Sequence, residues 1–134
     1  ALHPEGVVVT GYGSNPLASL YRIETSRYTA SGARPWHRQE TWNTALAYGS
    51  DVVLDSQGRA LVAGAVTQNG KLRGYVLGRA VNDNNGGTLL EHWFPGVGPS
   101  EGLGIARDMF DRIFPVGYVT SSGTTQARIT RIHG

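Results

Sequence analysis

Residues 49–70 read GSDVVLDSQGRALVAGAVTQNG, and residues 102–123 read GLGIARDMFDRIFPVGYVTSSG. The two stretches align without a gap at a step of 53 residues, and seven of their 22 positions are identical. The identical pairs are Gly49/Gly102, Asp55/Asp108, Arg59/Arg112, Gly64/Gly117, Val66/Val119, Thr67/Thr120 and Gly70/Gly123. Gly11, at the end of an apolar run, precedes Gly64 by the same step. A step used more than once predicts an array of similar units, each of which buries its face against a neighbour.

Within each unit the pattern is that of short strands joined by tight turns. Residues 51–54 and 74–77 are rich in β-branched and aromatic side chains, with Gly, Asn, Asp or Ser close by on either side. No stretch of 11 residues keeps a helical spacing of apolar residues without an interrupting glycine or proline. Gly64 and Gly117, inside predicted strands, are expected to lie close to a neighbouring backbone or at a bulge.

The turn between two strands of a unit is predicted from Asp55 and Gly58, and again from Asp108 and Asp111. A turn aspartate accepts hydrogen bonds from the backbone that follows it, and glycine or aspartate tolerates a positive φ. Because Asp55 and Asp108 recur at the repeat step, we assign both of them, and Gly58, to structural turns rather than to a ligand site.

The order of these segments predicts ten strands. They are expected at about 6–12, 18–25, 34–42, 50–55, 60–67, 73–81, 88–94, 103–108, 112–120 and 125–132. Four antiparallel strands in about 50 residues is the layout of a propeller blade. We therefore predict an all-β, propeller-like fold of about two and a half four-stranded blades, with units at 1–48 (partial), 49–101 and 102–134 (partial). A single β-sandwich is the alternative, although sandwich strands do not recur at an equal step.

The pattern Asp55-x-x-Gly58-Arg59-x-x-Val62-x-Gly64, followed by an apolar strand that ends at an arginine, resembles the bacterial β-propeller repeats of the delta-60 and seven-bladed types. The second copy departs from that pattern at two positions, where it has aspartate and proline. The resemblance implies a secreted, periplasmic or cell-surface propeller that binds or scaffolds. It implies no catalytic residues, because these repeats share no active site.

Composition excludes several classes of protein. A net charge of +2 and an apolar content of 40% argue against disorder. No run of 18 apolar residues occurs, so no membrane span is expected. Lysine and arginine are scattered, so no nucleic-acid partner is expected. The absence of cysteine excludes disulfides and thiolate chemistry.

No cofactor or metal is predicted. The histidines show no HxH, HxxxH or HExxH spacing; they are His3, His37, His92 and His133. Residues 82–87 are rich in oxygen donors, but Asp83 is their single acid, so a polar turn is favoured over a calcium loop.

Enzymatic activity is not expected. The chain has no Gly-x-Ser-x-Gly pattern, and no predicted helix follows the glycine-rich residues 96–102 to hold a phosphate. The first hypothesis is a non-catalytic binding or scaffold module. The alternative is a carbohydrate-binding lectin with sites between blades. A hydrolase with paired carboxylates is third, and its candidate acids are Glu91, Glu101, Asp108 and Asp111.

Four residues are predicted to bind a ligand: Trp36, His37, Tyr48 and Trp93. Flat aromatic faces beside polar groups can hold sugars or peptides. Trp42 and Trp93 follow their repeat glycines at similar distances, which favours core packing for both. Trp36 has no counterpart in the second unit and is predicted to make an exposed contact.

The predicted strands also indicate a partner. The chain is expected to open on a second strand and to end on a third, which would leave sheet edges and apolar faces uncovered. We therefore expect it to close a ring as a homo-oligomer, two copies making five blades, or to join further blades of a longer chain. A glycan or a protein is the expected ligand.

Overall fold

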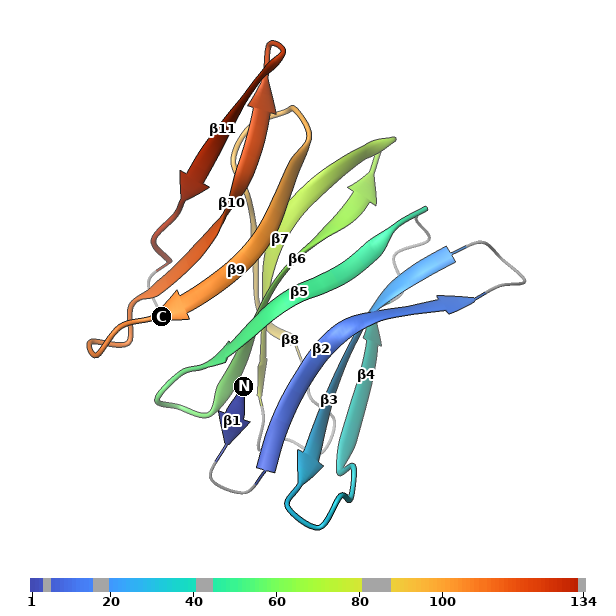
Figure 1. Ribbon diagram of the computed structural model, residues 1–134, viewed down its shortest axis with the longest axis vertical. Coiled ribbons are helices and arrows are strands. Elements are labelled where there is room, and N and C mark those ends of the chain that lie inside the picture. Colours follow the sequence, from blue (N-terminus) through green and yellow to red (C-terminus); the bar gives the residue numbers. More distant parts are fainter. Residues whose placement is uncertain (4–5, 16–19, 41–44, 81–87, 133–134) are drawn as a thin grey trace.

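The computed structural model describes residues 1–3, 6–15, 20–40, 45–80 and 88–132 of the 134-residue chain. These residues form eleven strands in three antiparallel sheets, and the described ranges contain no helix (Figure 1). The first sheet contains β1 (Leu2–His3), β2 (Gly6–Asn15), β3 (Leu20–Thr29) and β4 (Trp36–Glu40). The second contains β5 (Ala47–Leu54), β6 (Arg59–Gln68), β7 (Lys71–Ala80) and β8 (Thr88–Trp93). The third contains β9 (Ser100–Arg107), β10 (Ile113–Ser121) and β11 (Thr124–Ile129), with β10 in the middle.

The prediction of an all-β fold is confirmed, and the strands form separate antiparallel sheets of three or four members. The expectation that the chain opens on a second strand is wrong. The short strand β1 pairs with β2 through Leu2 and Val7. Ala1 extends this pairing, because its ammonium donates to the Val8 oxygen at 2.7 Å and its oxygen accepts from the Val8 N–H at 2.8 Å. The three sheets have four, four and three strands. A strand of two residues is too short to show a period-2 pattern.

The 53-residue step recurs in the strand pairing. Gly49 pairs with Gly64 in the second sheet, and Gly102 pairs with Gly117 in the third. Both ladders are shifted by a β-bulge immediately beside this glycine pair. A bulge bends its strand and strengthens the local twist. The two units therefore share their backbone irregularity as well as their sequence.

Two of the repeated glycines lie where no side chain fits. A Cβ added at Gly64 would overlap the backbone oxygen of Tyr48, and one added at Gly117 would overlap that of Glu101. Tyr48 and Glu101 are themselves one repeat step apart. Gly11, the first glycine of the series, has no atom within 4 Å of its added Cβ. The reason is that β1 pairs only with the first two residues of β2 and does not reach Gly11.

The aspartate turns have the same geometry in both units. Asp55 Oδ1 accepts hydrogen bonds from the N–H groups two and four positions later, at 2.9 and 2.8 Å, and its other oxygen pairs with Arg59 Nε. Asp108 makes the same backbone bonds at 2.9 and 3.0 Å. Gly58 and Asp111 both have a positive φ, of 73° and 63°. Aspartate therefore replaces glycine at a left-handed position of the second turn.

The three sheets stack face to face, with β5 lying between β2 and β9 (Figure 1). Strand β5 packs against β2 and β3 of the preceding sheet, and β9 packs in the same way against β5, β6 and β7. Two buried clusters join the first and second sheets: Val8, Trp36 and Ala60, and then Ile23, Ala47, Val66, Tyr75 and Leu77. One larger cluster joins the second and third: Leu61, Ala63, Val76, Phe94, Ile105, Ile113, Val119 and Ile132. Each of these clusters combines residues of two neighbouring sheets. A sheet therefore buries a face only by packing against its neighbour, as expected for a repeat array.

Candidate functional site

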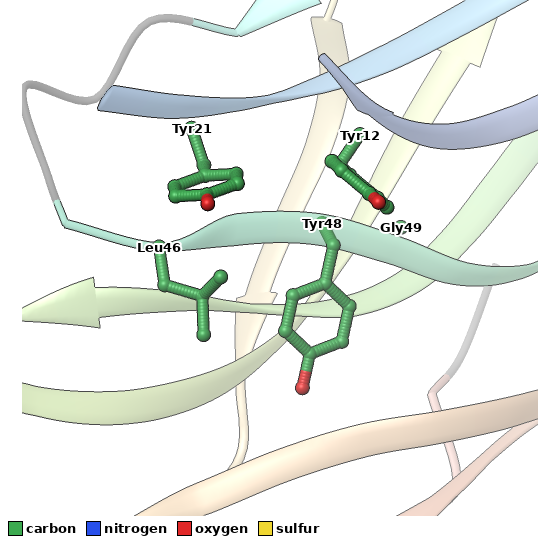
Figure 2. A pocket seen from close by; sticks show the side chains of 5 residues that line it. All are labelled: Tyr12, Tyr21, Leu46, Tyr48 and Gly49. Atoms are coloured by element: carbon green, nitrogen blue, oxygen red, sulfur yellow. The ribbon is translucent and has the colours of Figure 1, made fainter. Parts of the chain in front are cut away.

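An open hollow of about 340 Å³ lies between the first and second sheets. Five residues line it: Tyr12 and Tyr21 from the first sheet, and Leu46, Tyr48 and Gly49 from the start of the second (Figure 2). A volume of this size is at the lower end of the range for small-molecule sites, about 300 to 1,000 Å³.

The register between β2 and β3 places the two tyrosines of the first sheet. Tyr12 pairs with Ile23, and Ser14 pairs with Tyr21, so the two rings are diagonal neighbours on one face. Ile23 identifies that face, because it is fully buried against the second sheet. The ring centroids of Tyr12 and Tyr21 are 6.0 Å apart, and the rings are tilted by 53°. Tyr12 remains 66% exposed, so a ligand can reach its ring.

Strand β5 closes the hollow on the other side. Gly49 presents no side chain there, and a Cβ at this position would overlap the hydroxyl oxygen of Thr10. Tyr48 lines the hollow, but its ring points away from Tyr12 and Tyr21 (Figure 2). Its hydroxyl donates a hydrogen bond to Glu101 Oε1 in the third sheet.

Glu101 links Tyr48 to a second tyrosine. Burial, followed by the hydrogen bond to Glu101, raises the pKa of Tyr48. The hydrogen bond to Glu101, followed by burial, raises the pKa of Tyr118 on β10. Both hydroxyls therefore stay protonated near neutral pH and can act as donors. This network fixes the orientation of Tyr48, and it ties the wall of the hollow to the third sheet.

The corresponding place between the second and third sheets is filled. Ala65 stands one repeat step after Tyr12 and is fully buried. The ring of Phe94 lies against Gly74 and Gly102, as close as 2.8 and 3.2 Å to their added Cβ positions. Gly102 is the repeat equivalent of Gly49. The two interfaces thus share their backbone geometry, but Ala65 and Phe94 occupy the second where the hollow lies in the first.

The hollow suits a neutral ligand. None of its five lining residues carries a formal charge. Its lining offers the rings of Tyr12 and Tyr21, with Leu46 and Gly49 on the opposite side. Aromatic rings bind flat apolar surfaces, while phenol hydroxyls can donate or accept hydrogen bonds at the edge. Such a surface fits a molecule with apolar faces and hydroxyl groups around its rim.

The prediction that Trp36 makes an exposed contact is wrong. Trp36 is 4% exposed and packs in the cluster with Val8 and Ala60. Its burial depends on the second sheet, which supplies Ala60 from a distant part of the sequence. His37 is the next residue of β4, and its Nδ1 lies 2.6 Å from Ser26 Oγ.

The four predicted ligand-binding residues do not form one site. Tyr48 is the one that lines the hollow. Trp93, on β8, is half-buried and packs against Tyr75 with ring centroids 6.1 Å apart. His37 lies on the face of the first sheet that points away from the second. Trp42 and residues 82–87, with Asp83, lie outside the described residues, as does His133.

The candidate carboxylates of a hydrolase are held elsewhere. Asp108 and Asp111 lie in one turn, where Asp111 accepts hydrogen bonds from Ser56 at 3.0 and 2.6 Å. These bonds from Ser56 are the main cause that lowers the pKa of Asp111. Glu101 is bonded to Tyr48, and Glu91 lies on β8. Among the residues with a described structure, no group of three or more His, Asp or Glu is placed to hold a metal ion.

Sequence reasoning missed most of the hollow. A usable signal was the residue after each repeat glycine, which is Tyr12 in the first unit and Ala65 in the second. A large side chain where the next unit has a small one indicates different packing at the two interfaces. Tyr12 and Ser14 lie on the same face of β2, and Ser14 is paired with Tyr21 on β3. The position of Tyr21 beside Tyr12 therefore depends on the strand register, which the sequence does not reveal directly.

Comparison with known proteins finds no family model that matches the chain and no curated protein similar to it. Within the described residues, no helix is long and apolar enough to cross a membrane.

Proposed function

We propose that this protein is a non-catalytic binding module that holds a carbohydrate in the hollow between its first and second sheets. The observation that carries the proposal is the pair of tyrosine rings beside the bare backbone of Gly49, in a hollow lined by uncharged residues. Sugar rings have apolar C–H faces and hydroxyl edges, which match aromatic faces with polar groups nearby.

The placement of the acidic residues supports a binding role over hydrolysis. Paired carboxylates about 5 to 10 Å apart across an open cleft are the requirement for glycoside hydrolysis. Here Asp108 accepts a hydrogen bond from Arg112, Asp111 accepts one from Ser56, and Glu101 accepts one from Tyr48.

The proposed place of action, outside the cytoplasm, depends on the resemblance of residues 55–64 to bacterial propeller repeats.

Replacing Tyr12 with alanine is expected to weaken binding of a saccharide about tenfold. Loss of aromatic stacking costs about 0.5–1.5 kcal/mol, and about 1.4 kcal/mol corresponds to a factor of ten. The melting temperature should change little, because Tyr12 is 66% exposed. The measurement is isothermal titration with members of a glycan panel that bind the unmodified protein.

Tyr28→Ala is the matched control. Tyr28 lies on β3 like Tyr21, but its pairing with Val7 puts it on the opposite face of the sheet. Binding should survive this change. Equal losses for Tyr12→Ala and Tyr28→Ala would contradict the proposed site, and so would a panel without any binder.

A further inference from the structure

The two tyrosine rings of the hollow are tilted against each other. Tyr12 and Tyr21 are diagonal neighbours on one face of the first sheet, with ring centroids 6.0 Å apart and 53° between the ring planes. A ligand held between two aromatic rings needs a layer of contact on each side, at about 3.5–4.0 Å per layer and so about 7–8 Å in all. The rings are too close together for such a sandwich. They therefore form a platform of two inclined planes, and a ligand lies across both.

The opposite side divides the hollow into two halves. Leu46 lies on the Tyr21 side, and Gly49 lies on the Tyr12 side (Figure 2). The Tyr12 half is the more open one, because glycine carries no side chain and Tyr12 is 66% exposed. The Tyr21 half is more enclosed, because Tyr21 and Leu46 are both half-buried. Each half thus has one aromatic ring and its own opposite wall.

One aromatic face covers one sugar ring. The six-membered rings of a tyrosine and of a hexose have about the same size, and stacking brings the apolar C–H face of the sugar parallel to the aromatic plane. Neighbouring sugars of a chain are joined through a single oxygen atom, so their rings lie side by side. Two tyrosine rings side by side therefore fit two neighbouring sugars rather than one.

The tilt selects the linkage between these two sugars. Each sugar ring lies parallel to the tyrosine beneath it, so the two sugar planes must meet at an angle close to the 53° between the aromatic planes. In a cellulose-type, β-linked glucan both bonds at the linkage are equatorial, and the chain is an extended ribbon with nearly parallel ring planes. In a starch-type, α-linked glucan one bond is axial, and each linkage turns the next ring out of the plane of the previous one. The second geometry lets both sugars lie flat on their tyrosines, whereas the first does not.

We propose that the hollow binds two neighbouring sugars of a bent, α-linked saccharide of neutral hexoses, one stacked on Tyr12 and the next on Tyr21. The length and the linkage of the ligand are added here to the proposed carbohydrate-binding function, on which they rest. The uncharged lining of the hollow suits a neutral saccharide. Longer chains continue into solvent past Tyr12, at the open end of the platform.

Isothermal titration with glucose, maltotetraose and cellotetraose tests length and linkage. Maltotetraose should bind about tenfold more tightly than either of the other two, because a second stacked ring contributes about that factor. Equal affinities for glucose and maltotetraose, or an equal or higher affinity for cellotetraose, would overturn the two-sugar, α-linked ligand and leave the proposed function standing. So would binding of other saccharides without maltotetraose. Failure of a whole glycan panel to bind would refute both.

Variants of the two tyrosines separate the role of each ring from its effect on folding. Tyr12→Phe and Tyr21→Phe keep the rings and should keep the preference for maltotetraose over glucose. Tyr12→Ala and Tyr21→Ala should each reduce that preference to about twofold or less, because one of the two sugars then has no ring to stack on. Tyr28→Ala, on the opposite face of the first sheet, is the matched control and should leave the preference unchanged. A loss of stability lowers both affinities by the same factor, so their ratio is not affected by it.

Nuclear Overhauser contacts between sugar and tyrosine protons locate the two sugars directly. The chain has six tyrosines, and the two phenylalanine variants identify the ring signals of Tyr12 and Tyr21. With methyl maltoside, a ligand of two sugars, the two rings are expected to contact protons of different sugars. Contacts from both rings to one and the same sugar would contradict the two-sugar platform, even where binding itself is confirmed.

Discussion

Gly64→Ala is expected to destabilise the protein by at least about 3 kcal/mol, while Gly11→Ala changes the stability by less than about 0.5 kcal/mol. The two residues occupy equivalent positions of the repeat. An added methyl group at Gly64 overlaps the backbone oxygen of Tyr48 and lies 2.9 Å from the hydroxyl oxygen of Tyr75. Backbone atoms of a paired strand cannot move aside without breaking the ladder. At Gly11 the same methyl group meets nothing within 4 Å.

Urea unfolding of the two variants, followed by circular dichroism, measures this difference. Gly117→Ala provides a second arm, because its methyl group would overlap the backbone oxygen of Glu101. It should resemble Gly64→Ala and not Gly11→Ala. If all three alanine variants had equal stability, the close approach of the first two strands in each repeat would be disproved.

Asp55→Ala is expected to destabilise the protein by about 3 kcal/mol. The Asp55 side chain is 1% exposed and satisfies two backbone N–H groups as well as Arg59. Its removal leaves these donors without an acceptor in a place that water hardly reaches, and unsatisfied buried groups cost about 1–3 kcal/mol each. Asp108→Ala should cause a smaller loss, because the Asp108 side chain is 25% exposed and water can replace it.

Thermal melting of the two aspartate variants checks this order. Saccharide binding serves as the control, since both turns lie outside the hollow and the folded fraction should bind normally. Loss of binding with an unchanged melting temperature in Asp55→Ala would mean that the aspartate belongs to a ligand site and not to a turn.

The repeat was the most informative part of the sequence. Identical glycines and aspartates at one step predicted the strand β6, found at Arg59–Gln68, and the turn that precedes it. These features depend on short-range backbone chemistry: a turn aspartate, a residue with positive φ and a run of β-branched side chains. Strand β5 begins earlier than expected, at Ala47, because Tyr48 and Gly49 pair with β6 despite their weak strand pattern.

The candidate site was harder to predict, because it depends on contacts between sheets. The sequence around Trp36 predicted an exposed side chain. In the structure Trp36 is buried, because it packs against Ala60 of the second sheet. Tyr12 and Tyr21 form the hollow through their register, and Gly49 completes it from a third strand. A single sequence gives no record of which distant positions touch.

Nuclear magnetic resonance of the ¹⁵N-labelled protein, titrated with the panel saccharides, tests the proposed function most directly. We expect concentration-dependent shifts of the amide signals of four residues that surround the hollow: Tyr12, Tyr21, Leu46 and Gly49. Signals of His37 and Trp93 should stay in place. Shifts confined to His37 or Trp93, or a complete lack of response to every saccharide, would contradict the assignment of the hollow as a carbohydrate site.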